Sequence, residues 1–151
     1  MTKAYNTAHT TNLTLLDDNL TAPTETWNIV ASALSSTATN IDCLTSGVWY
    51  YTTAATATFG FNFRGNSTTT LASILAVGQS VTINILNTSG TTAYYPTTFT
   101  VDGTSVTPKW SGGTAPSAGN ASAIDTYSFT ITKTAATPTY TVFASGAIKY
   151  A

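Results

Sequence analysis

Hydrophobic and polar residues alternate with a period of two along much of the chain, and helical periodicity is nearly absent. The segment TFGFNFRG places Phe59, Phe61 and Phe63 on one face of an extended strand. A strand with this pattern lays one face against a hydrophobic core, so the pattern predicts β-structure. The same alternation occurs in SVTINIL (80–86), TYSFTIT (126–132) and PTYTVFAS (138–145).

Turn-forming residues separate these segments from one another. The dipeptide Asp102-Gly103 lies between TFTV and SVTP, and it suits the positive φ angles of a two-residue hairpin turn. Only TTTLASILAV (68–77) has a pattern that fits a helix, and a short one. Further strands are predicted for TNLTLL (11–16), TWNIVASAL (26–34), GVWYYTT (47–53), TTFTV (97–101) and AIKYA (147–151).

About eight to ten short strands, each with one apolar face, predict an all-β protein with at most one short helix. We expect an antiparallel β-sandwich of jelly-roll-like type. The length of 151 residues suits one hydrophobic core, so residues 21–151 are predicted to form a single sandwich domain. Residues 1–20 are polar and weakly patterned, which predicts an N-terminal arm that becomes ordered against a neighbouring molecule.

Charged residues make up only 7% of the chain, whereas about 25% is usual for soluble proteins. The net charge is −1, and the five cations are scattered along the sequence. Nucleic-acid binding requires clustered cations, so no nucleic-acid partner is expected. No apolar run approaches the ~20 residues that span a bilayer, so we expect no membrane association, and the first residues lack the pattern of a secretory signal.

Candidate catalytic chemistry is sparse. The sole histidine, His9, lies in the polar arm, and the single cysteine, Cys43, has apolar neighbours that predict an unreactive thiol in the core. Asp17-Asp18 is interpreted as a solvated turn, and no loop carries the alternating acidic ligands of a calcium site. We therefore expect no enzymatic activity, no bound metal and no cofactor.

Aromatic residues form 11% of the chain, and several occupy consecutive positions. Consecutive rings cannot all face one core, so some of them face away from it. Three interpretations stay open for these rings: contact with a second subunit, stacking on a sugar, or packing over the rim of the sandwich. The candidate subunit or glycan contacts are Trp49, Tyr50, Tyr51, Tyr94 and Tyr95.

Trp110 is a further candidate for such a contact. It lies in the loop segment TPKWSGGTAPSAGN (107–120), between two alternating segments. Its large apolar ring is costly to leave in water, so we expect it to fold back over the open end of its own sandwich. Contact with a neighbouring subunit and stacking on a ligand are the alternatives.

The C-terminal half, about residues 75–151, contains VGQSVTINILN, AYYPTTFTVDGTSVTPKWSGGTAPSAGNASAIDTYSFTITKT and TYTVFAS. It includes the ordered run P-x-W-x-G-G-x-x-P-x-x-G-N followed by the strand pattern I-D-x-Y-x-F. This half resembles a domain of virion structural proteins of marine tailed phages, which includes capsid decoration and tail-fibre proteins. Residues 1 to about 55 carry no comparable motif.

The resemblance implies a place in a virus particle rather than catalysis, and it supplies no active site. A fibre subunit needs an attachment segment and a shaft, which do not fit beside one sandwich in 151 residues. We therefore expect a small knob or decoration protein, made in the host cytoplasm and carried on the outer surface of a marine phage capsid. Its expected partners are the major capsid protein or other virion proteins, and further copies of the chain in a homo-oligomer. The alternatives are a tail or tail-fibre component that engages host surface glycans, and a free lectin.

Overall fold

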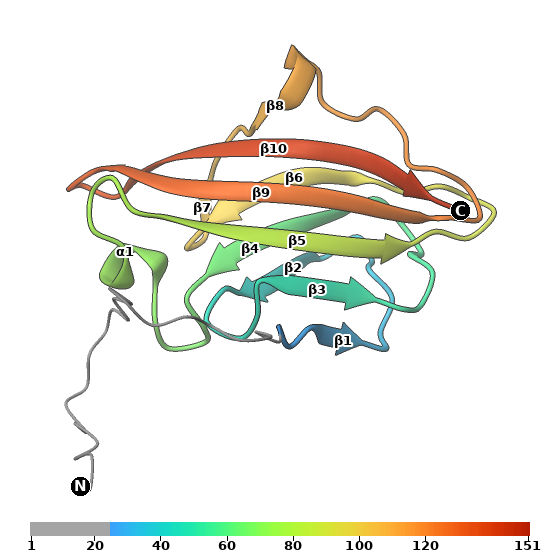
Figure 1. Cartoon of the computed structure of the whole chain (residues 1–151), viewed down its shortest axis with the longest axis horizontal. Coiled ribbons are helices and arrows are strands. Elements are labelled where there is room, and N and C mark those ends of the chain that lie inside the picture. The colour runs from blue at the N-terminus through green and yellow to red at the C-terminus, as the bar shows by residue number, and fades with distance from the viewer. Residues whose placement is uncertain (1–24) are drawn as a thin grey trace, which may run out of the picture.

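A computed structural model describes residues 25–151 as two β-sheets packed face to face (Figure 1). The six-stranded sheet has the order β1-β3-β5-β9-β10-β8, and the four-stranded sheet has the order β2-β4-β6-β7. The strands of the larger sheet are β1 (Asn28–Val30), β3 (Val48–Tyr51), β5 (Ser80–Thr88), β8 (Lys109–Trp110), β9 (Ile124–Ala135) and β10 (Thr139–Tyr150). Those of the smaller sheet are β2 (Ala38–Asp42), β4 (Phe59–Arg64), β6 (Pro96–Val101) and β7 (Thr104–Ser105). A short helix, α1 (Leu71–Ile74), and a 3₁₀ turn, η1 (Ser111–Gly113), complete these elements. The all-β sandwich with one short α-helix is confirmed.

The strand directions differ from the antiparallel jelly-roll arrangement that the sequence led us to expect. From β1 to β6 the chain alternates between the two sheets, so each strand lies parallel to the one before it in the same sheet. Only three of the strand pairs, β5 with β9, β9 with β10, and β6 with β7, are antiparallel. Both sheets are therefore mixed. Residue alternation determines which face of a strand is dry and carries no information on the direction of its neighbour, which is why the sequence pattern missed this winding.

The core consists of the inward faces of both sheets, as the alternation predicts. Phe59, Phe61 and Phe63 of β4 are buried side by side. Phe129 of β9 crosses from the other sheet and packs against them, with ring centroids 5.8 Å from Phe61 and 5.1 Å from Phe63. Tilted and edge-to-face aromatic contacts of this kind add to the stability that burial provides.

The predicted turn at Asp102-Gly103 is confirmed. Val101 of β6 pairs with Thr104 of β7, and the two residues between them have φ angles of 49° and 80°. Two successive positive φ angles are those of a two-residue hairpin turn with the twist that flanking strands favour. The turn also positions the Asp102 carboxylate toward α1.

Candidate functional site

The outer face of the six-stranded sheet carries a row of side chains that crosses five strands and is apolar on all of them except β9. The strand registers place Ile29 beside Tyr50, Tyr50 beside Leu86, Leu86 beside Thr126, and Thr126 beside Ile148. Partnered residues of adjacent strands point to the same face, and alternate residues on these strands, such as Ile85 and Tyr127, are buried in the core. The row therefore lies on the outer face of the sandwich.

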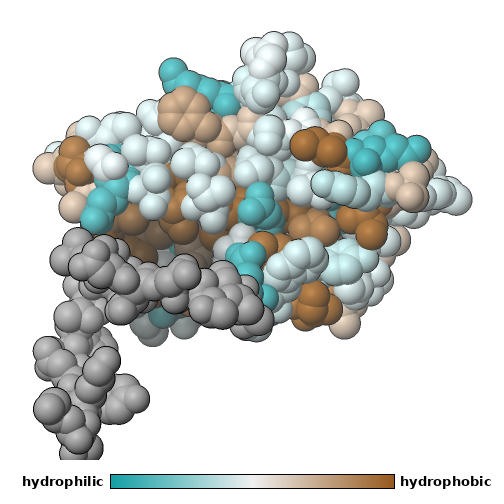
Figure 2. All heavy atoms as spheres, in the orientation of Figure 1, coloured by the Kyte–Doolittle hydropathy of each residue, from teal (hydrophilic) through white to brown (hydrophobic). Residues whose placement is uncertain are grey.

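Several large side chains of this region are open to solvent. Trp27, Ile29, Ile148 and Tyr150 are each between 47% and 58% exposed, whereas Tyr50 and Leu86 are half-buried beside them. We call these six residues the sheet-face patch. Figure 2 shows hydrophobic residues (brown) at several places on the molecular surface, between pale and hydrophilic ones. A contiguous exposed apolar surface of this kind is typical of an interaction site.

A cavity of about 630 Å³ opens within the sheet-face patch. Its lining combines Trp27, Tyr150 and Leu86 of the patch with neighbouring side chains. The remaining residues of the lining are Glu25, Val48, Asn84, Ile124 and Thr126. Among residues 25–151 the lining is thus largely apolar, and Glu25 is its one charged residue.

A second group of exposed apolar side chains lies around α1, at the other end of β5. Leu44, Ile74 and Val77 are between 39% and 56% exposed, and we call them the helix-end patch. Leu44 and Ile74 border a cavity of about 690 Å³. Figure 1 places α1 and the C-terminus at opposite ends of the sandwich. The two patches are therefore separate surfaces.

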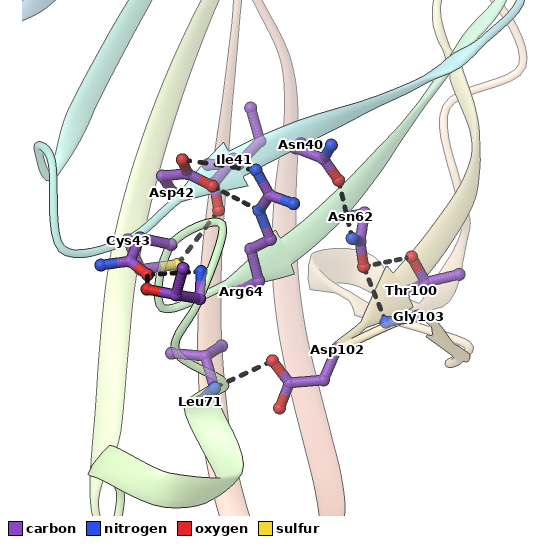
Figure 3. A network of polar contacts seen from close by, with 12 residues as sticks. Asn40, Ile41, Asp42, Cys43, Asn62, Arg64, Leu71, Thr100, Asp102 and Gly103 are labelled. Atoms are coloured by element: carbon purple, nitrogen blue, oxygen red, sulfur yellow. Dashed lines mark hydrogen bonds and ion pairs between the residues drawn. The ribbon is translucent and has the colours of Figure 1, made fainter.

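The outer face of the four-stranded sheet is polar, in contrast to the sheet-face patch. Asn40 accepts a hydrogen bond from the Asn62 amide (2.8 Å), and the Asn62 oxygen accepts from the Thr100 hydroxyl (2.7 Å) and from Gly103 N (2.9 Å) (Figure 3). Beside this ladder, the guanidinium of Arg64 donates to Asp42 at 2.6 Å. Arg64 and Asn62 also line a polar cavity of about 330 Å³. Most of these polar groups are paired with one another across the strands.

The helix α1 is held at both ends by side chains that are distant in the sequence, one from the β6–β7 turn and one from β9. The Asp102 carboxylate accepts hydrogen bonds from Leu71 N (2.8 Å) and Ala72 N (2.9 Å) at its start. Lys133, which is buried, donates to the carbonyl oxygens of Ala72 (2.7 Å) and Leu75 (2.8 Å) near its end. A helix of four residues cannot satisfy its own terminal groups, so these two side chains stabilise it. Asp102 therefore has a structural role that its position in a hairpin turn did not indicate.

The structure places the five aromatic candidates, which form the two runs 49–51 and 94–95, in different surroundings. Trp49 and Tyr51 point into the core, where their rings stack at 6.5 Å, so neither presents a face to a partner. Tyr50, between them, lies on the outer face as part of the sheet-face patch. Tyr94 and Tyr95 are half-buried in the connection between β5 and β6 and do not join this patch.

Trp110 lies in β8, which pairs in parallel with β10 at the edge of the larger sheet. Its partly buried ring makes edge-to-face contacts with Phe99 at 5.8 Å and Phe129 at 5.9 Å. The prediction that it packs against its own sandwich is confirmed by these contacts. The segment expected to be a loop thus contributes a short strand whose tryptophan extends the core.

The end of the same segment surrounds a buried carboxylate. Asp125 is fully buried, and it accepts hydrogen bonds from Asn120 N (2.8 Å), from the Asn120 side-chain amide (2.6 Å) and from Ser89 Oγ (3.4 Å). Gly119 lies so close that a Cβ there would meet Tyr94 O at 2.6 Å and Asp125 Oδ2 at 2.8 Å. The G-N and I-D parts of the C-terminal motif are therefore packed against each other within the fold.

Burial changes the titration of two side chains that lie apart from the two patches. Burial raises the pKa of the Cys43 thiol to about 12, so the thiol stays protonated at neutral pH, in line with the expected unreactive cysteine. Burial, with a contribution from Asp102, also raises the pKa of Tyr140 to about 12. Within residues 25–151, no group of three or more His, Cys, Asp or Glu side chains is placed to hold a metal ion. His9 and Asp17-Asp18 lie outside the described residues, as does the arm predicted for residues 1–20.

Sequence analysis named Tyr50 and missed the four most exposed members of the sheet-face patch. The segments TWNIV and AIKYA have large apolar or aromatic residues at every second position. These are Trp27 and Ile29 in the first segment, and Ile148 and Tyr150 in the second. That alternation was taken as a sign of a face directed to the core. In β10, Val142 and Ala144 are buried whereas Ile148 and Tyr150, at positions of the same parity, are exposed, because the pairing register shifts between Ser145 and Ile148. Sequence alternation does not reveal such a shift.

Comparison with models of known protein families, with curated proteins and with solved structures found no match to this chain. Among the described residues, no helix has the length and apolar character needed to cross a membrane.

Proposed function

We propose that this protein is a non-enzymatic structural protein of a virion, a small knob or decoration protein on the outer surface of a marine phage capsid. The observation that carries the proposal is the presence of two separate exposed apolar patches on one small sandwich. A protein that occupies a fixed place in an assembly has to contact more than one neighbour, and each patch offers one contact. The resemblance of residues 75–151 to virion structural proteins supports the same role.

The scarcity of charge is consistent with this placement. Charged residues form 7% of the chain, and the six residues of the sheet-face patch and the three of the helix-end patch are all uncharged. Contacts between apolar surfaces depend little on ionic strength, whereas ion pairs on a surface are screened within ~3 to 10 Å in salt. Apolar patches therefore suit attachment to a particle in seawater.

In this proposal the helix-end patch contacts the capsid. Leu44, Ile74 and Val77 protrude around α1, and the clamps from Asp102 and Lys133 hold that helix in position. An apolar surface on a fixed scaffold loses little conformational entropy when it docks. The sheet-face patch is then left for another neighbour.

The proposal is tested by the composition of purified particles. Quantitative mass spectrometry of virions of the encoding phage should find the protein at a copy number that follows the icosahedral symmetry of the head. A particle assembled with the Val77→Glu protein should carry far fewer copies, because the substitution puts a charge into the apolar contact. Absence of the wild-type protein from particles would overturn the proposal.

A tail or tail-fibre component that engages host glycans is the second candidate. It is favoured by the cavity of the sheet-face patch, where the exposed rings of Trp27 and Tyr150 lie with the polar side chains of Glu25 and Asn84. Aromatic faces beside hydrogen-bonding groups can hold a saccharide. A glycan array with the wild-type protein, repeated with Trp27→Ala, tests this candidate, and an array without binding would exclude it.

A further inference from the structure

The sheet-face patch combines a row of side chains on one sheet with the cavity that opens beside it. Its row from Ile29 to Ile148 follows the hydrogen-bonded registers of β1, β3, β5, β9 and β10, so its members stand side by side on one rigid sheet. Trp27 and Tyr150 extend it along the strand direction, where they line the cavity. Two sheets that pack through such faces lie about 10 Å apart with their strands rotated by about 30°.

Two hydroxyl groups on this face are already buried in the single chain. The hydroxyl oxygen of Thr126, between Leu86 and Ile148, is buried and has no hydrogen-bond partner in the structure of residues 25–151. The hydroxyl oxygen of Thr88, two residues after Leu86 on the same face, is also buried and without a hydrogen-bond partner among residues 25–151. A partner that docks over this part of the face therefore strips no water from these two hydroxyl oxygens.

The lack of charge on the six patch residues bears on the kind of partner that fits them. Partners of a different kind are usually matched by complementary charge, but the six patch residues offer none. Two copies that meet through the uncharged row from Ile29 to Ile148 bring apolar residues onto apolar residues about a two-fold axis, and the charged residues of this face, Glu25 at the cavity and Lys109 on β8, lie outside that row. The charged pair of Asp42 and Arg64 lies instead on the outer face of the other sheet.

We infer that the sheet-face patch is the interface of a homodimer, in which the six-stranded sheets of two copies pack face to face about a two-fold axis. The dimer goes beyond the proposed place in a virion, since it depends only on the surface of the isolated chain. Each copy keeps its helix-end patch free at the end of the sandwich remote from the interface. One dimer therefore presents two sites for contact with a capsid.

The test measures the mass of the purified full-length protein by sedimentation equilibrium over a range of concentrations. The wild type should reach twice the chain mass of 15.7 kDa. Ile148→Glu should raise the dissociation constant by roughly a hundredfold, because the symmetry places the new charge in the interface twice. Val77→Glu is the matched control: Val77 is 55% exposed and Ile148 is 53% exposed, so both variants add one carboxylate at an equally accessible aliphatic position.

The two surfaces should respond in opposite ways. Val77→Glu should leave the dimer intact, and circular dichroism should show that both variants fold, since neither position is in the core. A wild type that stays monomeric at all concentrations would overturn the inference. So would a dimer that survives Ile148→Glu or dissociates with Val77→Glu, because the interface would then lie elsewhere. A monomer that binds a saccharide through Trp27 would assign the patch to glycans instead. Loss of the protein from virions would overturn only the proposed function, so the two failures are distinguishable.

Discussion

The hydrogen bond between Asn120 and Asp125 should be among the most important polar contacts in this fold. Asp125 is an acidic side chain with no exposure to solvent, and the amide of Asn120 donates to its Oδ1 at 2.6 Å. Asn120→Ala removes this donor but keeps the bond from the backbone N at 2.8 Å. A hydrogen bond to a charged group contributes about 1.5–3 kcal/mol, and a buried carboxylate that loses it cannot turn to water instead.

We therefore expect Asn120→Ala to lower the free energy of unfolding by about 2–3 kcal/mol. For a chain of this size that corresponds to a fall of roughly 4–12 °C in Tm. Urea denaturation followed by tryptophan fluorescence gives the free energy, and a thermal scan by circular dichroism gives Tm. The expected loss comes from the charge of the acceptor and its burial, so it should not appear at a solvent-exposed asparagine.

Asn40→Ala provides the matched control. Its side chain also makes one bond to another side chain, to Asn62 at 2.8 Å, but at an exposed position between neutral groups. Its loss should cost less than about 1 kcal/mol. If Asn120→Ala unfolds at the same urea concentration as Asn40→Ala, the reasoning about Asp125 is refuted, and the G-N and I-D parts of the motif would need a role other than stability.

Three further variants probe other parts of the sandwich. Trp110→Ala should lower the free energy of unfolding of the isolated protein by about 3 kcal/mol, because its ring contacts Phe99 and Phe129; a melting curve equal to that of the wild type would mean that the ring matters only in an assembly. Gly103→Val should destabilise the turn by about 1–2 kcal/mol in a urea titration while far-UV circular dichroism stays unchanged, since φ is 80° there and a β-branched residue disfavours it; equal stability would indicate another turn conformation. The folded protein should react slowly with a thiol reagent at pH 8, because burial raises the pKa of Cys43 to about 12 from an ordinary value of 9.0, and rapid reaction without denaturant would contradict that burial. The raised pKa favours the protonated thiol in the folded state. The contribution of Cys43 to the free energy of unfolding is therefore full below pH 9 and decreases between pH 9 and 12, and Cys43→Ala should remove this pH dependence.

The parts of the fold that depend on local pattern could be predicted from the sequence. The three phenylalanines of β4 and the apolar residues of β5 and β9 are buried where their alternation placed them. The Asp102-Gly103 turn follows from the backbone preferences of two residues. Trp110 packs against its own core, as expected for an apolar ring that is costly to leave in water.

The parts that depend on distant residues could not be predicted. The parallel winding of β1 to β6 depends on which sheet each strand joins, and alternation is the same for either choice. The clamps on α1 come from Asp102 and Lys133, which lie about thirty and sixty residues away from it in the sequence. The row from Ile29 to Ile148 exists only after five strands are in register, so no single segment reveals it.

The most direct test of the proposed role is a cryo-EM reconstruction of the virion at a resolution that resolves β-sheets. The account predicts density for this sandwich at symmetry-related positions on the outer capsid, with Leu44, Ile74 and Val77 turned toward the capsid surface and paired copies meeting through their six-stranded sheets. Density for the sandwich confined to the tail, or a particle map without it, would contradict the assignment to the capsid.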